Sequence, residues 1–238
     1  MTTATPPFHC KQFTVQHDRC AMKVGTDALL LGAWAEVPEL GAVLDIGAGS
    51  GILSLMVAQR TSGSVAITGI ELDQDATQQA ADNAAQSPWQ ERIAFLQGDV
   101  LSWQAPSRYD MIISNPPFFS DSLGSPKAAR QQARHADSLP FHAMIKRVTE
   151  WLTPNGQFSF ILPVSSAQQL IALAEPLGWH VRRHCAVQST PDKTAHRWMV
   201  SLVRQACATD VTTLTIKDAT HAYSAEYRAL LRDFYLRF

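Results

Sequence analysis

Cysteine is scarce in this sequence, and its spacing excludes several kinds of site. The 238 residues include 4 cysteines, Cys10, Cys20, Cys185 and Cys207, which stand far apart and form no C-x-x-C pair. The paired spacing of zinc ligands is therefore missing, and free thiols are the expected state in a reducing compartment. We expect no metal site and no reactive cysteine.

Long apolar runs are also missing. No run reaches the roughly 18 residues that a membrane-spanning helix needs. The first residues show no basic segment followed by an apolar one, so the sequence indicates no signal peptide. We therefore expect a cytoplasmic protein that does not contact a membrane.

Basic residues are not in excess. The chain has 20 Lys and Arg against 21 Asp and Glu, a formal net charge of −1. Proteins that bind nucleic acid regardless of sequence usually carry a basic excess, so a specific RNA partner would have to meet a local basic patch. The hydrophobic content of 46% and the charged content of 17% are typical of a globular enzyme and not of a disordered chain.

A glycine-rich turn between two apolar segments is the main feature that the sequence does contain. Val43–Ile46 predicts a strand, the turn follows at 47–51, and Ile52–Ala58 predicts a helix. Strand, turn and helix together open a doubly wound α/β domain. Glycines let the backbone approach a ligand, and the free N–H groups at the helix start favour an anion. The spacing is G-x-G-x-G and not the dinucleotide pattern G-x-G-x-x-G, and Asp45 adds a carboxylate at the end of the strand.

A second strand-like run, Val65–Glu71, ends in an acidic residue. Glu71 stands 20 residues after Gly51, the distance at which an acidic side chain meets the ribose hydroxyls of a bound nucleotide. A carboxylate at this place can also cap the following helix, but Asp73 or Asp75 is available for that purpose. The spacing therefore favours Glu71 as a ribose ligand.

The most specific motif is Asn115-Pro116-Pro117-Phe118, which directly follows the strand-like run Tyr109–Ser114. Two prolines fix the backbone, remove two N–H donors and stiffen the turn. They leave the Asn115 side chain and the Pro116 carbonyl as outward-facing acceptors, followed by an aromatic ring. The motif predicts a site that holds a hydrogen-bond donor at the end of this strand.

The segment before the glycine turn offers a second set of polar groups. Met22–Asp27 precedes the apolar run Ala28–Trp34, and Thr26 or Asp27 is the expected N-cap of a helix. Lys23, Thr26 and Asp27 can bind the charged end of a small ligand. The alternative is a capped helix that only packs on the sheet.

The remaining segments complete a sheet of seven strands. Strand-like runs follow at 93–100, 157–162, 180–187 and 197–204, and the last two suggest a hairpin. Residues 211–216 are also β-rich, and Ser224 is the expected cap of a helix whose apolar stripe starts at Tyr227. We expect a short strand or hairpin in an N-terminal extension, residues 1–21, and one catalytic domain over residues 22–238.

A polar insertion at 119–137 follows the proline motif. It carries four basic side chains, those of Lys127, Arg130, Arg134 and His135. Beside an active site they could hold a phosphate backbone, and a solvated loop is the alternative.

These motifs resemble a known family. Asp45 to Gly51 resembles motif I of the class I S-adenosylmethionine (AdoMet) methyltransferases, and Asn115 to Phe118 resembles motif IV of those that methylate amino groups conjugated to a π-system. From Met22 to Leu236 the chain resembles the bacterial tRNA (adenine-N6)-methyltransferases that modify adenosine 37 of valine tRNA. The more particular matches are Arg130 with Ala133-Arg134-His135, and Glu226-Tyr227 to Asp233-Phe234-Tyr235.

The resemblance implies a fold, a cofactor and a substrate. The fold is a doubly wound, Rossmann-like sheet of seven strands with the last strand antiparallel, the cofactor is AdoMet, and the partner is tRNA. Asp99 would accept a hydrogen bond from the adenine amine of the cofactor and the Val100 backbone would support its ring, whereas Asp99 by itself reads as a turn residue. The implied catalytic residues are Asn115, Pro116, Pro117 and Phe118. The implied RNA-binding residues are Lys127, Arg130, Arg134 and His135. The implied cofactor-binding residues are Lys23, Thr26, Asp27, Asp45, Gly47, Gly49, Gly51, Glu71, Asp99, Val100 and Asn115.

Other functions explain the sequence less well. A release-factor glutamine methyltransferase has tyrosine in place of Phe118 and usually a helical N-terminal domain. A DNA adenine methyltransferase would bring a target-recognition domain, and an NAD oxidoreductase would leave the proline motif unexplained. A non-catalytic RNA-binding module on the same fold stays open, and it differs from the enzyme in binding no AdoMet.

Overall fold

The computed structural model describes residues 5–116 and 141–238. Part of the predicted site lies outside these ranges. The site residues concerned are Pro117, Phe118, Lys127, Arg130, Arg134 and His135. Their roles stay predictions.

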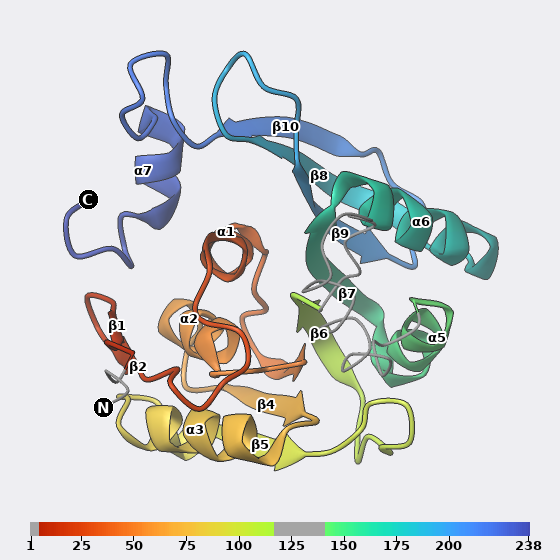
Figure 1. The fold of residues 1–238 in the computed structure, drawn as a ribbon. Coiled ribbons are helices and arrows are strands. Elements are labelled where there is room, and N and C mark those ends of the chain that lie inside the picture. Colours follow the sequence, from red (N-terminus) through yellow and green to blue (C-terminus); the bar gives the residue numbers. More distant parts are fainter. Residues whose placement is uncertain (1–4, 117–140) are drawn as a thin grey trace, which may run out of the picture.

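The described residues build an eight-stranded sheet with the order β10-β8-β9-β7-β6-β3-β4-β5 (Figure 1). The strand bounds are β3 Gly41–Ile46, β4 Val65–Glu71, β5 Ile93–Gln97, β6 Tyr109–Ser114, β7 Leu152–Pro163, β8 His180–Gln188, β9 Arg197–Val203 and β10 Asp210–Thr215. β9 runs antiparallel to β7 and β8, and the other neighbours are parallel. For β3 to β9 this confirms the predicted doubly wound sheet with its last strand antiparallel.

β10 is an addition to the seven predicted strands. The β-rich stretch pairs in parallel with β8, from Asp210 opposite Arg183 to Thr215 opposite Gln188. β8 therefore has a partner on both sides, and the chain leaves the sheet edge toward its last helix. β7 also starts earlier than expected, at Leu152, and its register against β6 shifts between Tyr109 and Met111.

Helices cover both faces of the sheet. The helix bounds are α1 Thr26–Trp34, α2 Ile52–Arg60, α3 Gln74–Ala85, α5 Phe141–Trp151, α6 Val164–Ala174 and α7 Ala225–Leu231, with short 3-10 helices η1 Gln90–Arg92 and η2 Glu175–Leu177. Figure 1 shows α5 and α6 on one side of the sheet and α1, α2 and α7 on the other. The sheet is thus the middle layer of three.

Side-chain parity along the strands produces two separate cores. Successive strand residues point to opposite faces. Val43 belongs to the cluster shared with α1 and α2, and its neighbour Leu44 belongs to the cluster shared with α5 and α6. Central strands such as β6 are buried nearly throughout, which explains the apolar run Met111–Ile113 in its middle.

The expected N-terminal hairpin is present as β1 (Phe8–His9) and β2 (Thr14–Val15). It is packed on the C-terminal segment. The Lys11 amide donates to the Phe234 carbonyl at 2.9 Å, and the Lys11 ammonium donates to the Phe238 carbonyl at 2.9 Å. Cys10, Phe13 and Val15 of this extension belong to the same core as α1 and α2. The division at residue 21 stays a prediction.

The helix starts differ in one respect from the expectation. Gly25, and not Thr26 or Asp27, is the N-cap of α1, and no side chain caps this helix. Asp73 caps α3 by accepting from the Ala76 amide at 2.8 Å, and Ser224 caps α7 as predicted. The first N–H groups of α1 therefore have no side-chain partner.

Candidate active site

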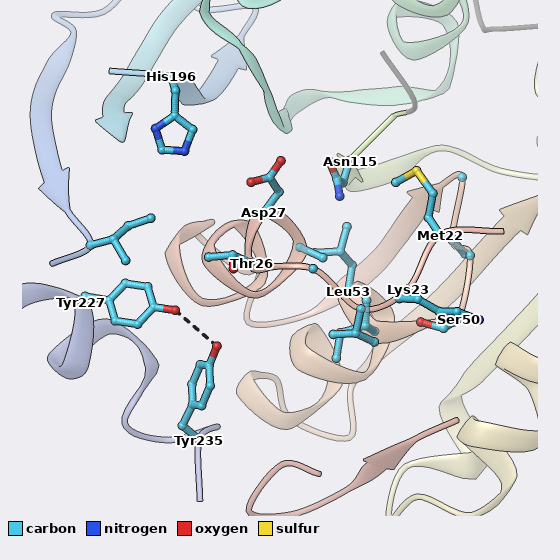
Figure 2. Close-up of a pocket in the computed structure, with 18 of the residues that line it drawn as sticks. Met22, Lys23, Thr26, Asp27, Ser50, Leu53, Asn115, His196, Tyr227 and Tyr235 are labelled. Atoms are coloured by element: carbon cyan, nitrogen blue, oxygen red, sulfur yellow. Dashed lines mark hydrogen bonds between the residues drawn. The ribbon is translucent and has the colours of Figure 1, made fainter. Parts of the chain in front are cut away.

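A cavity of about 550 Å³ lies at the carboxyl ends of β3 and β6. In the sheet, β4 lies on one side of β3 and β6 lies on the other, so the strand order reverses here. Ligands of doubly wound folds bind at such a point. Four parts of the chain line the cavity (Figure 2). The first is residues 22–28, and the second is most of the glycine turn together with the start of α2. The third is Asn115, and the fourth is a set of separate residues between His196 and Tyr235.

The glycine turn forms one wall. Gly47, Gly49 and Gly51 all have positive φ, at 71°, 53° and 79°. A Cβ on Gly47 or Gly49 would have no atom within 4 Å, so both positions face open space, and both line the cavity. Gly51 has another role, because a Cβ there would lie 2.7 Å from the Phe95 ring. It lets the turn pack closely and does not line the cavity.

Glu71 at the end of β4 holds the turn in place. Its Oε2 accepts from the Gly49 amide at 2.8 Å, and its Oε1 accepts from the Asp73 amide at 3.0 Å. A carboxylate oxygen has a further lone pair, so these bonds leave capacity for ribose hydroxyls. The observed role of Glu71 is to order the turn, and its role as a ribose ligand stays a prediction.

Asp45 is fully buried and does not line the cavity. Its Oδ2 accepts from both the amide (3.1 Å) and the hydroxyl (2.8 Å) of Ser54 in α2, and its Oδ1 has no partner among the described residues. The observed role of Asp45 is to tie the end of β3 to α2 through Ser54. Direct contact with a ligand, which the sequence suggested, finds no support in this geometry.

Burial raises the pKa of the Asp45 carboxyl to about 7, with a smaller contribution from the negative charge of Glu71. The ordinary aspartate pKa is about 3.9, so between these values the folded protein holds a proton that the unfolded chain has lost. Stability from this proton is full below about pH 4 and is lost as the pH rises through about 7. Relative to Asp45→Asn, which cannot ionise, the wild type should therefore lose unfolding free energy as the pH rises from about 4 to about 7. Urea unfolding of both proteins across this range measures it, and a constant difference would show that Asp45 keeps an ordinary pKa.

Lys23 before α1, and Thr26 and Asp27 in its first turn, belong to another wall of the cavity. The Lys23 ammonium donates to the carbonyls of His17 (2.9 Å) and Asp18 (3.3 Å), so it also orders its own loop. Asp27 is paired with Arg197, whose Nε lies 2.8 Å from its Oδ2. In Figure 2 the Asp27 carboxylate stands between His196 and Asn115.

Asn115 lies at the end of β6 and reaches the cavity. The preceding Ser114 hydroxyl donates to the Ile46 carbonyl at 2.8 Å, which ties the ends of β6 and β3 together. The Asn115 Oδ1 is buried and has no hydrogen-bond partner among the described residues. An unpaired buried acceptor costs about 1–3 kcal/mol, and this one belongs to a residue that lines the cavity, which makes Asn115 a candidate ligand contact. Pro116 is buried next to it.

Asp99 and Val100 do not line this cavity. The Asp99 Oδ1 accepts from the Leu101 amide at 2.9 Å, and its carbonyl accepts from the Trp103 amide at 2.8 Å. These bonds are those of a turn residue, the alternative role predicted from the sequence for Asp99. Its contact with an adenine ring, and that of Val100, stay predictions.

Comparison with known proteins identifies the family. The methyltransferase small domain family matches residues 19–175. A protein of Tolumonas auensis named tRNA1(Val) (adenine(37)-N6)-methyltransferase is 44% identical over 230 residues, which cover 97% of each chain. A protein of the same name from Bacteroides thetaiotaomicron is 41% identical, and the match covers 98% of each chain. The chain belongs to this methyltransferase family.

Solved structures agree on the fold of the family. A predicted O-methyltransferase from Agrobacterium tumefaciens superposes with a TM-score of 0.64 at 21% identity, covering 87% of this chain and 96% of that one. A glycopeptide N-methyltransferase in complex with S-adenosyl-L-homocysteine superposes with a TM-score of 0.56 at 16% identity, covering 78% of this chain and 92% of that one. The fold is therefore that of class I AdoMet methyltransferases.

The described ranges contain no cluster of three or more His, Cys, Asp and Glu residues that could hold a metal ion. No helix within them is long and apolar enough to cross a membrane. The four cysteines are free thiols.

The cavity of this methyltransferase also includes residues that the sequence did not suggest as site residues. They are His196, Ile216, Lys217, Tyr223, Tyr227 and Tyr235. Tyr227 is 1% exposed, as its place in an apolar stripe predicted, and it still contributes to the cavity wall. No local pattern marks these residues, because His196 precedes β9 and the other five reach the site with β10, α7 and their flanking segments.

Proposed function

We propose that the protein transfers a methyl group from AdoMet to the exocyclic N6 amine of adenosine 37 in the anticodon loop of valine tRNA. The observation that carries the proposal is the unpaired Asn115 Oδ1, which shares one cavity with the glycine turn. The substrate is taken from relatives that match nearly the full chain and are named for this reaction. Those names do not favour a glutamine methyltransferase.

The residues present fit AdoMet. Side-chain atoms on Gly47 or Gly49 would fill the space that the turn leaves open, and the start of α1 offers N–H groups with no side-chain cap. We infer that the turn receives the nucleoside part, with Glu71 at the ribose, and that residues 22–27 receive the methionine part. AdoMet supplies a sulfonium methyl group that a nucleophile can accept directly.

Asn115 would then orient the nucleophile. The lone pair of an adenine N6 amine is delocalised into the ring, so the amine attacks poorly. The Asn115 Oδ1 and the Pro116 carbonyl can accept hydrogen bonds from the two N–H groups of this amine. They would thereby direct its lone pair toward the methyl group. Orientation of this kind lowers a barrier by as much as ~7–11 kcal/mol in the best cases. No strong base is needed, because the proton is lost after the nitrogen has gained its fourth bond.

The RNA-binding residues that the sequence suggests lie outside the described ranges. Phe118 would stack on the target base, worth about 1–3 kcal/mol, which offsets much of the few kcal/mol that unstacking costs. Lys127, Arg130, Arg134 and His135 would hold the phosphates around it.

The test is methyl transfer from labelled AdoMet to valine tRNA transcribed without modifications, followed by nucleoside analysis. We expect N6-methyladenosine in the tRNA and none in a control tRNA with guanosine at position 37. Label in both RNAs would contradict the position, and label only in a release factor would contradict the substrate class.

A further inference from the structure

The cavity extends beyond the groups that the proposed function uses. Figure 2 shows Tyr227 and Tyr235 across the cavity from Ser50 and Lys23, with Thr26 between the two sides. Tyr223 and Lys217 line the same cavity. The proposed roles of the glycine turn and Asn115 give no function to the tyrosines at this end of the cavity.

Tyr223 presents an open aromatic surface. Its side chain is 41% exposed, whereas Tyr227 is 1% exposed. The Tyr223 ring stacks on Tyr227 with the centroids 4.9 Å apart and the planes at 14°, and its edge meets Phe238 at 5.3 Å. The ring is therefore held by two aromatic neighbours, and the exposed 41% of the side chain is open to a ligand.

A structured turn places Lys217 beside Tyr223. The two residues form an isolated antiparallel bridge, and the Asp218 carboxylate closes the turn by accepting from the amides of Thr220 (2.8 Å) and Ala222 (3.2 Å). His221 within it has a φ of 62°, which a non-glycine residue keeps only where its surroundings hold it. Among the described residues no carboxylate forms an ion pair with the Lys217 ammonium.

We propose that Tyr223 and Lys217 form a second nucleotide subsite for the RNA. Tyr223 stacks on the base next to the methylated adenosine, and Lys217 neutralises the adjoining phosphate. An aromatic face beside an unpaired cation is the combination with which proteins bind unstacked, single-stranded nucleotides. The inference rests on the proposed function and deepens it, since it assigns how the substrate loop is held open.

The experiment measures kcat/KM for valine tRNA and the Kd of AdoMet in parallel. The variants are Tyr223→Leu, which keeps apolar bulk over Tyr227 without a π face, Tyr223→Phe, which keeps the ring, and Lys217→Gln. Two matched controls do not line the cavity. They are Leu236→Ala, at a residue 59% exposed, and Lys193→Gln, at a side chain 69% exposed.

We expect Tyr223→Leu to lower kcat/KM for tRNA about 5- to 100-fold, and Tyr223→Phe to keep nearly the wild-type value. Lys217→Gln should lower kcat/KM and reduce the slope of its logarithm against log salt by about 0.7. The Kd of AdoMet should stay within about twofold in all variants, because the subsite contacts only RNA. Both controls should match the wild type.

A valine tRNA with an abasic nucleotide on one side of adenosine 37 identifies the stacked base. On the correct side, loss of the base should lower wild-type kcat/KM as much as Tyr223→Leu does, and the variant should lose nothing further. Equal activity of Tyr223→Leu and wild type on the intact tRNA would overturn the subsite while leaving the proposed function standing. A raised Kd of AdoMet in that variant would overturn it too, since the tyrosine would then hold the cofactor. If the wild type itself transfers nothing to valine tRNA, the proposed function fails, and the subsite fails with it.

Discussion

Asn115→Ala is expected to lower kcat for methyl transfer by about 10²- to 10³-fold, the usual effect of losing one preorganised polar group at a reacting centre. The alanine removes the unpaired Oδ1 of a residue that lines the cavity, so in the proposed mechanism the substrate amine loses the acceptor that orients its lone pair. The Kd of AdoMet should change by no more than about threefold, because the turn and residues 22–27 are untouched. Single-turnover kinetics with valine tRNA and calorimetry with AdoMet separate the two quantities.

Two further variants make this prediction specific. Asn115→Asp keeps an acceptor oxygen at the same place and should retain more activity than Asn115→Ala. Asn155 does not line the cavity, and its side-chain oxygen accepts a hydrogen bond from Gln205. Asn155→Ala should therefore behave as the wild type. Wild-type turnover in Asn115→Ala would remove this residue from the mechanism.

Gly49→Ala is expected to weaken AdoMet binding about 10- to 100-fold, the range that forced overpacking of a fitted site produces. Gly49 has a φ of 53° and faces open cavity, so a methyl group there occupies the space of the ligand without meeting the protein. The left-handed backbone should also cost the variant roughly 1–2 kcal/mol of stability. Calorimetry with AdoMet and urea unfolding measure the two effects.

Gly178→Ala is the matched control for this change. Gly178 has a φ of 79° at the end of η2, so an alanine suffers a comparable backbone penalty, but the nearest atom to its Cβ belongs to Arg204 and the residue does not line the cavity. We expect a similar loss of stability with an unchanged Kd of AdoMet. An equal loss of affinity in both variants would mean that Gly49 acts through stability alone.

The parts of the site that the sequence predicts are those formed by neighbouring residues. The glycine turn and Asn115 each directly follow a strand, and parallel strands bring their carboxyl ends to one edge, so their meeting follows from the pattern. The apolar runs also predict the number of the seven core strands and their places in the chain, because buried parallel strands are apolar on both faces.

The parts that could not be predicted depend on packing between distant segments. Tyr223 reaches the cavity only because β10 pairs with β8 and the turn at 218–222 folds back. Asp45 ends a strand as predicted, but its carboxylate turns under the helix toward Ser54, a direction that residue spacing does not give. Gly25 is the N-cap of α1 in place of the expected Thr26 or Asp27, because the helix already starts at Thr26.

The most direct test of the central claim is a crystal structure of the protein with S-adenosyl-L-homocysteine. We predict that the ligand lies in the cavity between the glycine turn and residues 22–27, with its sulfur facing the Asn115 amide. A ligand bound elsewhere, or an Asn115 side chain turned into the core and away from the sulfur, would contradict the assignment.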